Sequence, residues 1–285
     1  MSLIADSPWS SRQVHLVSTA GIAIKGSETK ADLMFYFKTP IFDIPATYNA
    51  QISCVSCSIP YSWLNITSSN NRISLYIADQ EGYEFTSVHN LAIGQYSITD
   101  IITYLNQRLT ITAFATFGMV ATYSQATHTI TITSSTGTAY IGLFSGSLVD
   151  LLGISRAGAP YSFPFTSSKL INLLPTTSVY VETVGLLNES YDSRLQGQSG
   201  VLCRVPVNGA FNSMLTWVNT FHTRTQLSVK NLNNLRIRLL DDARNTLDLN
   251  GYTWSITLQF DIVSVKPFLA DDTLDRETLE IPHVA

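Results

Sequence analysis

The chain has 285 residues, a formal net charge of −4, and only 13% charged against 45% hydrophobic residues. Soluble domains carry about 25% charged residues, so the charged fraction of this chain is about half the usual one. Its high hydrophobicity and low net charge exclude a disordered chain. No apolar run approaches the ~20 residues of a membrane span, and the polar N-terminus lacks a signal-peptide pattern, so neither is expected. Basic residues number 17 against 21 acidic ones, which argues against a direct nucleic-acid role.

The scarcity of charge has two interpretations. Surface charge keeps monomers soluble, so a chain with few charges is expected to hide much of its surface against neighbouring proteins. In the other interpretation it is an ordinary β protein rich in Ser and Thr, whose hydroxyl groups face the solvent. Composition alone leaves both open.

The first part of the chain predicts an arm followed by strands. Residues 1–30 are polar with scattered apolar residues and no sustained period, which predicts an N-terminal arm. Residues 33–37 and 50–59 predict strands, and in the second of these the alternation shifts phase in the middle, which indicates a β-bulge. Residues 73–77 alternate with a strict period of two and predict a further strand.

The three cysteines, Cys54, Cys57 and Cys203, are too few and too odd in number for a disulfide framework. Cys54 and Cys57 have CxxC spacing, but they lie inside a predicted strand, whereas a redox motif begins a helix. Zinc would require two more ligands, and the five histidines are scattered. We therefore interpret all three as structural thiols and predict neither a metal site nor a cofactor. The absence of disulfides fits a reducing compartment.

A helix is predicted after Ser97. Ser97 is a typical N-cap, and Asp100, three residues later, complements the exposed backbone amides. Apolar residues then follow at helical spacing and define one face: Ile98, Ile101, Ile102, Leu105 and Leu109.

The helix belongs to a predicted insertion domain. Strands are expected at 119–124 and 128–133, and residues 147–150 repeat the cap pattern before a short helix that ends at Gly153. Residues 80–164 are thus predicted to form a compact α+β unit between stretches of pure β structure.

Strands resume beyond this unit. The clearest of them has apolar residues at alternate positions: Trp254, Ile256, Leu258, Phe260 and Ile262. About eight strands outside the insertion, with long connections, predict a mainly β fold, a single eight-stranded antiparallel jelly roll interrupted by the insertion domain. The predicted division is an arm over 1–30, a jelly roll over 31–79 and 165–267, the insertion domain over 80–164, and an acidic tail over 268–285.

No catalytic site is predicted. The sequence lacks the common nucleophile, metalloprotease and phosphate-loop motifs in a useful context, so we do not expect an enzyme. Asp241, Asp242 and Asp248 form a candidate Ca²⁺ set, but a hairpin turn also collects Asp and Asn, and we favour the turn.

Residues 235–260 resemble the closing hairpin of penton-type minor capsid proteins of virophages, polinton-like viruses and related large DNA viruses. The residues that fit the pattern are Asn245, Leu247, Asp248, Leu249, Asn250, Gly251 and Trp254. Residues 91–106 and 151–153 resemble landmarks of the insert in those proteins, and residues 201–206 resemble the strand before their final hairpins.

The resemblance implies a structural protein that forms homo-pentamers at the five-fold vertices of an icosahedral DNA-virus capsid, with the insertion domain projecting outward. It implies partners of two kinds, a double jelly-roll major capsid protein and other minor capsid proteins. It also implies a place in the virion after synthesis in the host cytoplasm. Extended termini would reach neighbouring capsomers, with Trp9 and Leu16 as candidate contact residues.

Two alternatives stay open. One is another minor capsid or cement protein of the jelly-roll type. The other is a carbohydrate-binding jelly roll, in which Tyr61–Trp63 or Tyr191–Asp192 would stack on sugars, although core or interface packing explains these aromatics better. The interpretations are compatible, because a projecting insertion domain is also placed to contact host-surface glycans.

Overall fold

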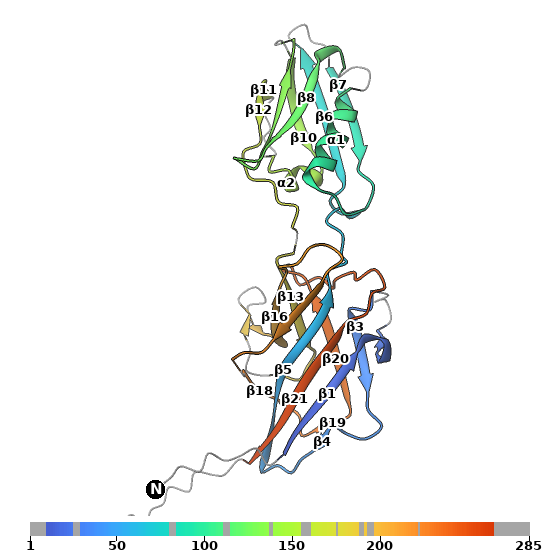
Figure 1. Ribbon diagram of the computed structural model, residues 1–285, viewed down its shortest axis with the longest axis vertical. Helices are drawn as coiled ribbons and strands as arrows, with labels where there is room; N and C mark the ends of the chain where they lie inside the picture. Colours follow the sequence, from blue (N-terminus) through green and yellow to red (C-terminus); the bar gives the residue numbers. More distant parts are fainter. Residues whose placement is uncertain are drawn as a thin grey trace, which may run out of the picture. The chain divides into compact units, whose positions relative to one another are not determined.

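The structure is a computed structural model (Figure 1). It describes residues 10–24, 29–79, 84–110, 115–136, 139–154, 161–174, 176–187, 191–192, 197–221 and 223–264. The chain divides into two compact units, and the second interrupts the first: residues 1–62 with 178–285 form the jelly-roll unit, and residues 63–177 form the insertion unit.

The jelly-roll unit consists of two main antiparallel sheets. The first has the order β1 (Ser10–Val17), β21 (Ser255–Ser264), β5 (Tyr48–Pro60) and β17 (Met214–Val218), and β18 (Thr225–Gln226) also pairs with β5. The second has the order β16 (Val201–Pro206), β13 (Ser178–Thr183), β20 (Asn234–Leu240), β3 (Asp32–Tyr36) and β2 (Ile22–Ala23). Shorter elements are η1 (Ser18–Ala20) and the pairs β4 (Phe42–Asp43) with β19 (Asn231–Leu232) and β14 (Tyr191–Asp192) with β15 (Gly197–Gln198). The predicted mainly β jelly-roll sandwich is confirmed.

The core of this unit is built by alternation along β21. The predicted apolar positions are buried, and Trp254, just before the strand, is 1% exposed. Its ring meets Phe35 edge to face at 6.0 Å between centroids, and its indole Nε1 donates to the Lys30 carbonyl at 2.7 Å. A period of two buries alternate side chains of a strand packed on one face, so the pattern predicted these burials directly.

The predicted arm over 1–30 is wrong for the residues that the structure describes. Strand β1 pairs with β21 from Ser10 opposite Ile262 to Val17 opposite Ser255, and β2 pairs with β3. Only Leu16 of β1 is buried, so hydrophobic periodicity carries little signal there. The strand is defined instead by its backbone hydrogen bonds to β21.

The predicted bulge in β5 is confirmed. Ser56 lies opposite Thr257 while Cys54 lies opposite Leu258, so Val55 has no partner residue in the ladder. A bulge inserts one residue into a strand and resets which face the following side chains occupy.

The insertion unit packs two helices on two small antiparallel sheets. One sheet has the order β11 (Tyr161–Ser162), β10 (Ala139–Ser145), β6 (Arg72–Asp79) and β7 (Glu84–Asn90). The other has the order β12 (Phe165–Thr166), β9 (Thr129–Ser134) and β8 (Met119–Ser124), and the helical elements are α1 (Ile98–Leu109), η2 (Ala115–Phe117) and α2 (Leu148–Leu151). Their apolar residues, including Ile77, Leu105 and Ile132, form one core.

The predicted boundaries of the insertion, 80 and 164, are too narrow. Strand β6 was assigned to the jelly roll, but it pairs with β7 and β10, and its apolar residues pack in the core of the insertion unit. Residues 165–166 pair with β9 and also belong to this unit. Alternation shows that a strand has one buried face, but it does not show which sheet the strand joins.

The two predicted helix starts have different outcomes. Ser97 accepts the Asp100 backbone N–H at 3.2 Å, and the Asp100 carboxylate accepts the Ser97 N–H at 2.8 Å, a complete capping box. Ser147 makes no side-chain cap, because its hydroxyl accepts the Arg72 backbone N–H. Gly153 ends α2 as predicted, at φ +68°, where an added Cβ would lie 2.1 Å from the Lys169 carbonyl oxygen.

Replacing Ser97 with alanine is expected to destabilise the insertion unit by about 1 kcal/mol, since the cap satisfies an otherwise unpaired backbone donor. Thermal unfolding followed by circular dichroism measures this loss. Thr99→Ala, at an exposed position in the first turn of the same helix, is the matched control, because the capping box does not use its side chain. An equal loss in both variants would contradict the capping role of Ser97.

Candidate interaction sites

The two predicted capsomer-contact residues have different positions. Trp9 lies outside the described residues. Leu16 is 3% exposed and lies opposite Ile256 in the sheet. Its side chain therefore belongs to the core of its own unit, and the prediction that Leu16 anchors an arm on a neighbour is wrong.

Of the two segments considered for sugar stacking, Tyr61–Trp63 is not available on the surface. Tyr61, Ser62 and Trp63 are all buried, and the Tyr61 ring packs edge to face on Phe211 at 5.8 Å. Core packing, the interpretation favoured from the sequence, therefore accounts for them. Tyr191–Asp192 forms β14, and its side chains lie outside the described part.

Two acidic residues of the candidate Ca²⁺ set, Asp241 and Asp248, and a third acidic residue, Glu182, have structural partners. Asp241 accepts the backbone N–H and the side-chain amide of Asn245, and Asp248 accepts the Asn250 N–H at 2.9 Å, which supports the hairpin-turn interpretation. The buried Glu182 forms an ion pair with Arg238. These contacts hold the carboxylates in turns and across strands, and they bring none of the three into a shared site.

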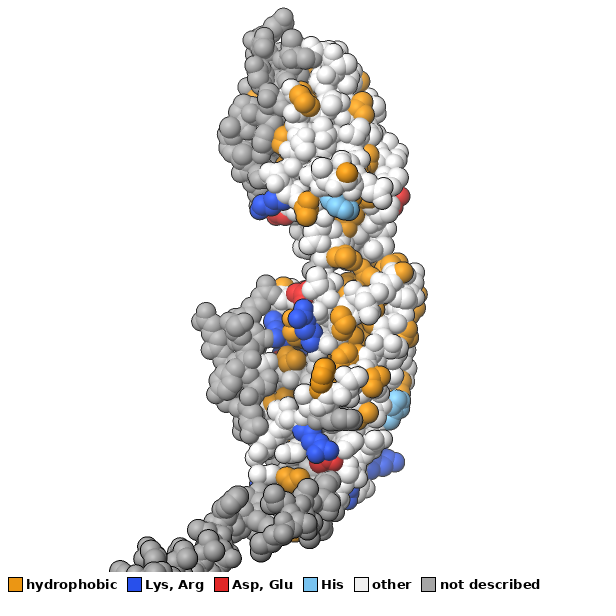
Figure 2. All heavy atoms as spheres, turned by 60° about the vertical axis from the view of Figure 1, so that its left-hand side comes forward, with side chains coloured by type: hydrophobic (Ala, Val, Ile, Leu, Met, Phe, Trp, Pro, Cys, Tyr) orange, Lys and Arg blue, Asp and Glu red, His pale blue; other side chains and the backbone are white. Residues whose placement is uncertain are grey.

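The edge strand β17 carries an exposed apolar surface. Met214 and Val218 are 53% and 61% exposed, and Phe221, just beyond the strand, is 87% exposed. We call these three residues the β17 edge patch. Edge strands are normally protected by charge, proline or a covering segment, and exposed apolar patches mark interaction sites. Figure 2 shows hydrophobic side chains spread over the visible face of the jelly-roll unit, with a few groups of Lys and Arg side chains among them.

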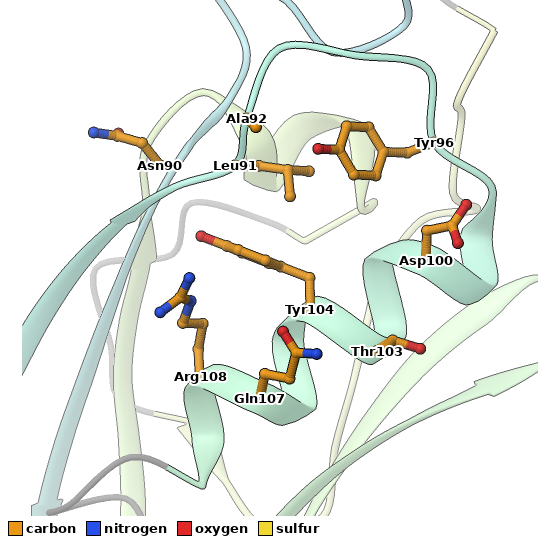
Figure 3. A pocket seen from close by; sticks show the side chains of 9 residues that line it. All are labelled: Asn90, Leu91, Ala92, Tyr96, Asp100, Thr103, Tyr104, Gln107 and Arg108. Atoms are coloured by element: carbon orange, nitrogen blue, oxygen red, sulfur yellow. The ribbon is translucent and has the colours of Figure 1, made fainter.

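The insertion unit has a hollow of about 350 Å³ over helix α1, shown in Figure 3. Its lining comes from the chain before the helix and from one face of the helix: Asn90, Leu91, Ala92, Tyr96, Asp100, Thr103, Tyr104, Gln107 and Arg108. Two aromatic rings, four neutral or basic hydrogen-bonding side chains and a carboxylate thus meet around one space. We call it the α1 hollow.

Tyr104 and Arg108 have unused hydrogen-bonding capacity in the α1 hollow. The Arg108 guanidinium lies over the Tyr104 ring, 4.9 Å from its centroid. Among the contacts of the described residues, neither the buried Tyr104 hydroxyl nor Arg108 Nε has a hydrogen-bond partner. Buried polar atoms without partners are uncommon and call for an explanation. The sequence offered no signal for this pair, because the spacing of four residues is equally typical of a solvated helix face.

His89 lies near the same arginine. Burial, together with the charge of Arg108, lowers the pKa of His89 from its ordinary value of 6.5, and its Nε2 lies 2.9 Å from the Ser87 hydroxyl. The neutral imidazole is therefore favoured in the folded state. The unfolded state binds a proton at this histidine more readily than the folded state does. The stability contributed by neutral His89 is therefore present above pH ~6.5 and is lost as the pH falls through the lowered pKa.

Replacing Arg108 with glutamine is expected to raise the pKa of His89, because one of the two causes of its depression is removed. NMR titration of the histidine ring protons measures this change. Gln107→Ala, next to Arg108 and without a change of charge, serves as the control. An unchanged midpoint in Arg108→Gln would show that burial alone lowers the pKa.

A second polar cluster lies inside the jelly-roll unit. Cys54, Cys57 and Cys203 are all buried, and their three sulfur atoms lie within 4.8 Å of one another. Hydrogen bonding to Cys54 and Cys57, with burial, raises the pKa of Cys203 well above its ordinary value. Sequence spacing pointed to Cys54 and Cys57 only, since Cys203 is distant in the chain and comes from the other sheet.

Comparison with known proteins identifies the fold. No protein-family model and no curated protein sequence matches the chain. Among solved structures, a crystal structure of the mavirus penton protein superposes with a TM-score of 0.54 at 13% identity, covering 89% of this chain and 100% of that one. This likeness agrees with the resemblance seen in the sequence and shows the same fold. Among the described residues, no helix is both long and apolar enough to cross a bilayer.

Proposed function

We propose that this chain is a structural capsid protein that forms homo-pentamers at the five-fold vertices of an icosahedral DNA-virus particle. The observation that carries this proposal is the fold shared with the mavirus penton protein over that protein's whole length. In this proposal the insertion unit projects outward. The partners are a double jelly-roll major capsid protein and other minor capsid proteins, and the chain is made in the host cytoplasm.

The surface of the jelly-roll unit supports assembly into a ring. Five subunits around an axis contact each other through two different faces, so each subunit needs lateral surfaces with few charges. The β17 edge patch is such a surface, and the low overall charge of 13% is consistent with it. We assign the β17 edge patch to the contact between neighbouring copies.

The oligomeric state in solution tests this proposal. One chain has a mass of 31.4 kDa, so light scattering is expected to give about 157 kDa, five times that mass. Negative-stain images of the same peak are expected to show five-fold rings. A stable dimer or trimer would contradict the proposal and favour the alternative of a cement-type jelly-roll protein. If the chain is a monomer in solution, the test is whether rings form when the major capsid protein is added. The absence of rings would then contradict the proposal.

The arm hypothesis is retained only for residues 1–9, ahead of β1. Deleting residues 1–25 would remove β1 and so damage the fold. Deleting residues 1–9 instead removes Trp9 and leaves the strand. We expect this truncation to reduce incorporation into particles while the unfolding temperature stays unchanged. Normal incorporation would exclude an arm that contacts neighbouring capsomers.

A second function is favoured by the α1 hollow, namely binding of a host-surface saccharide by the insertion unit. Sugar rings stack on aromatic side chains, and their hydroxyl groups pair with amide, guanidinium and phenol groups. The hollow holds Tyr96 and Tyr104 beside Gln107 and Arg108. The Tyr104 hydroxyl and Arg108 Nε have no hydrogen-bond partner among the described residues. A saccharide that enters the hollow would supply those partners once the side chains that close the two atoms off from solvent move aside.

A glycan array probed with the full-length chain tests this function. Binding is expected to be weakened in Tyr104→Phe, which removes only the unpartnered hydroxyl, and in Arg108→Gln. Val120→Ala, at an exposed position of β8, is the control and is expected to bind normally. No binding by the unmodified chain, or equal binding by all variants, would rule out the α1 hollow as a glycan site.

A further inference from the structure

We propose that Cys54, Cys57 and Cys203 together bind one thiophilic metal ion, Zn²⁺ or Cu⁺, between the two sheets of the jelly-roll unit. The proposal rests on the juxtaposition of the three sulfur atoms. It is independent of the capsid function, so the two can fail separately.

The bulge in β5 brings the first two thiols to one face. Cys54 lies opposite Leu258 and Cys57 opposite Ile256, and both partners face the core. In a regular strand, residues three apart point to opposite faces. The unpaired Val55 changes this phase, so that the CxxC pair of β5 points into the sandwich as two neighbouring donors.

The third thiol comes from the other sheet. Cys203 lies in β16, opposite Val181 of β13, and is 6% exposed. Packing of the two sheets brings its sulfur to the pair on β5. The set therefore links the first sheet to the second, and a bound ion would join strands that are about 150 residues apart in the chain.

The distances are close to those of a thiolate site. A Zn–S bond of about 2.3 Å places two ligating sulfurs ~3.8–4.0 Å apart, and here all three lie within 4.8 Å of one another. Shifts of less than about 1 Å per sulfur close the site, which is within the freedom of cysteine rotamers.

The donor set selects the class of metal. Thiolates bind soft ions such as Zn²⁺ and Cu⁺, whereas Mg²⁺ and Ca²⁺ require oxygen ligands. Within the described residues, the group contains cysteines only. A cuprous ion accepts three sulfurs, while zinc takes a fourth ligand, such as water, in the open tetrahedral position. Metal content measured for each ion separates these two cases.

The test uses the full-length chain purified under reducing conditions without chelators. Mass spectrometry of the metals and titration with Zn²⁺ or Cu⁺ are expected to give one ion per chain, and Co²⁺ is expected to produce a thiolate-to-metal charge-transfer band. Cys203→Ala is expected to lose binding. Val205→Ala, at a fully buried position of the same strand, creates a similar cavity and is expected to retain it. If Cys203→Ala does not fold, Cys57→Val removes a ligand with little change of volume.

Three results would overturn the proposal. The first is that the unmodified chain, with all its thiols reduced, binds neither Zn²⁺ nor Cu⁺. Alternatively, two of the three thiols are missing in the metal-free chain, which indicates a disulfide. Finally, the cysteine variants that fold bind the metal as well as the unmodified chain, which places the ion elsewhere. Binding that is lost with Cys203 or Cys57 and kept in Val205→Ala supports the site.

Discussion

Replacing Trp254 with alanine is expected to lower the free energy of unfolding of the jelly-roll unit by about 3–5 kcal/mol. The side chain is 1% exposed, packs edge to face on Phe35 and donates its indole N–H to the Lys30 carbonyl. The variant loses the buried surface, leaves a cavity and removes the partner of that carbonyl. Urea unfolding followed by far-UV circular dichroism measures the change.

Tyr252→Ala is the matched control for this variant. Tyr252 is an aromatic residue only two positions earlier, but it is 53% exposed, so its replacement is expected to change stability by at most about 0.5 kcal/mol. Trp254→Phe is expected to fall between the two, since it keeps much of the packing and loses the hydrogen bond. A loss of less than about 1 kcal/mol in Trp254→Ala would contradict the assigned core.

Replacing Val218 with aspartate is expected to abolish ring assembly while the subunit stays folded. The residue is 61% exposed, so the change costs little in the free subunit. In the proposed contact, however, it would place an unpaired carboxylate at a desolvated surface, which is strongly unfavourable. Phe221→Asp is expected to act in the same way. Light scattering of the purified variants measures the change in mass.

Val120→Asp controls for the general effect of an added surface charge. The Val120 side chain is 48% exposed, but it lies in β8 of the insertion unit, outside the β17 edge patch. We expect this variant to assemble like the unmodified chain. Intact rings with both Val218→Asp and Phe221→Asp would place the contact between subunits on another surface, and equal disruption by Val120→Asp would show that the effect is not specific.

Local patterns predicted the elements whose structure depends on near neighbours in the chain. The alternation after Trp254 predicted β21, because alternate apolar residues in a strand indicate which side chains face the core. The Ser97–Asp100 pair predicted the start of α1, because both hydrogen bonds of the capping box lie within four residues. The phase shift near Cys54 predicted the bulge, because a bulge changes the alternation of residues that are neighbours in the chain.

Elements that depend on distant partners were not predicted correctly. Strand β1 has a single buried side chain, and its position depends on β21, far along the chain. Strand β6 has a regular pattern, but its pairing with β7 and β10 decides that it belongs to the insertion unit. Ser147 has the residue type of a cap, yet its hydroxyl accepts from Arg72 instead.

The sequence by itself thus determined the mainly β jelly-roll class, the presence of an insertion and the local chemistry of its first helix. Its resemblance to penton-type capsid proteins agrees with the fold of the mavirus penton protein. Only the tertiary structure decided the limits of the insertion, the meeting of Cys203 with the CxxC pair and the α1 hollow. The physical reason is that periodicity records which face of an element is buried, whereas sheet order and packing across the core determine which distant residues meet.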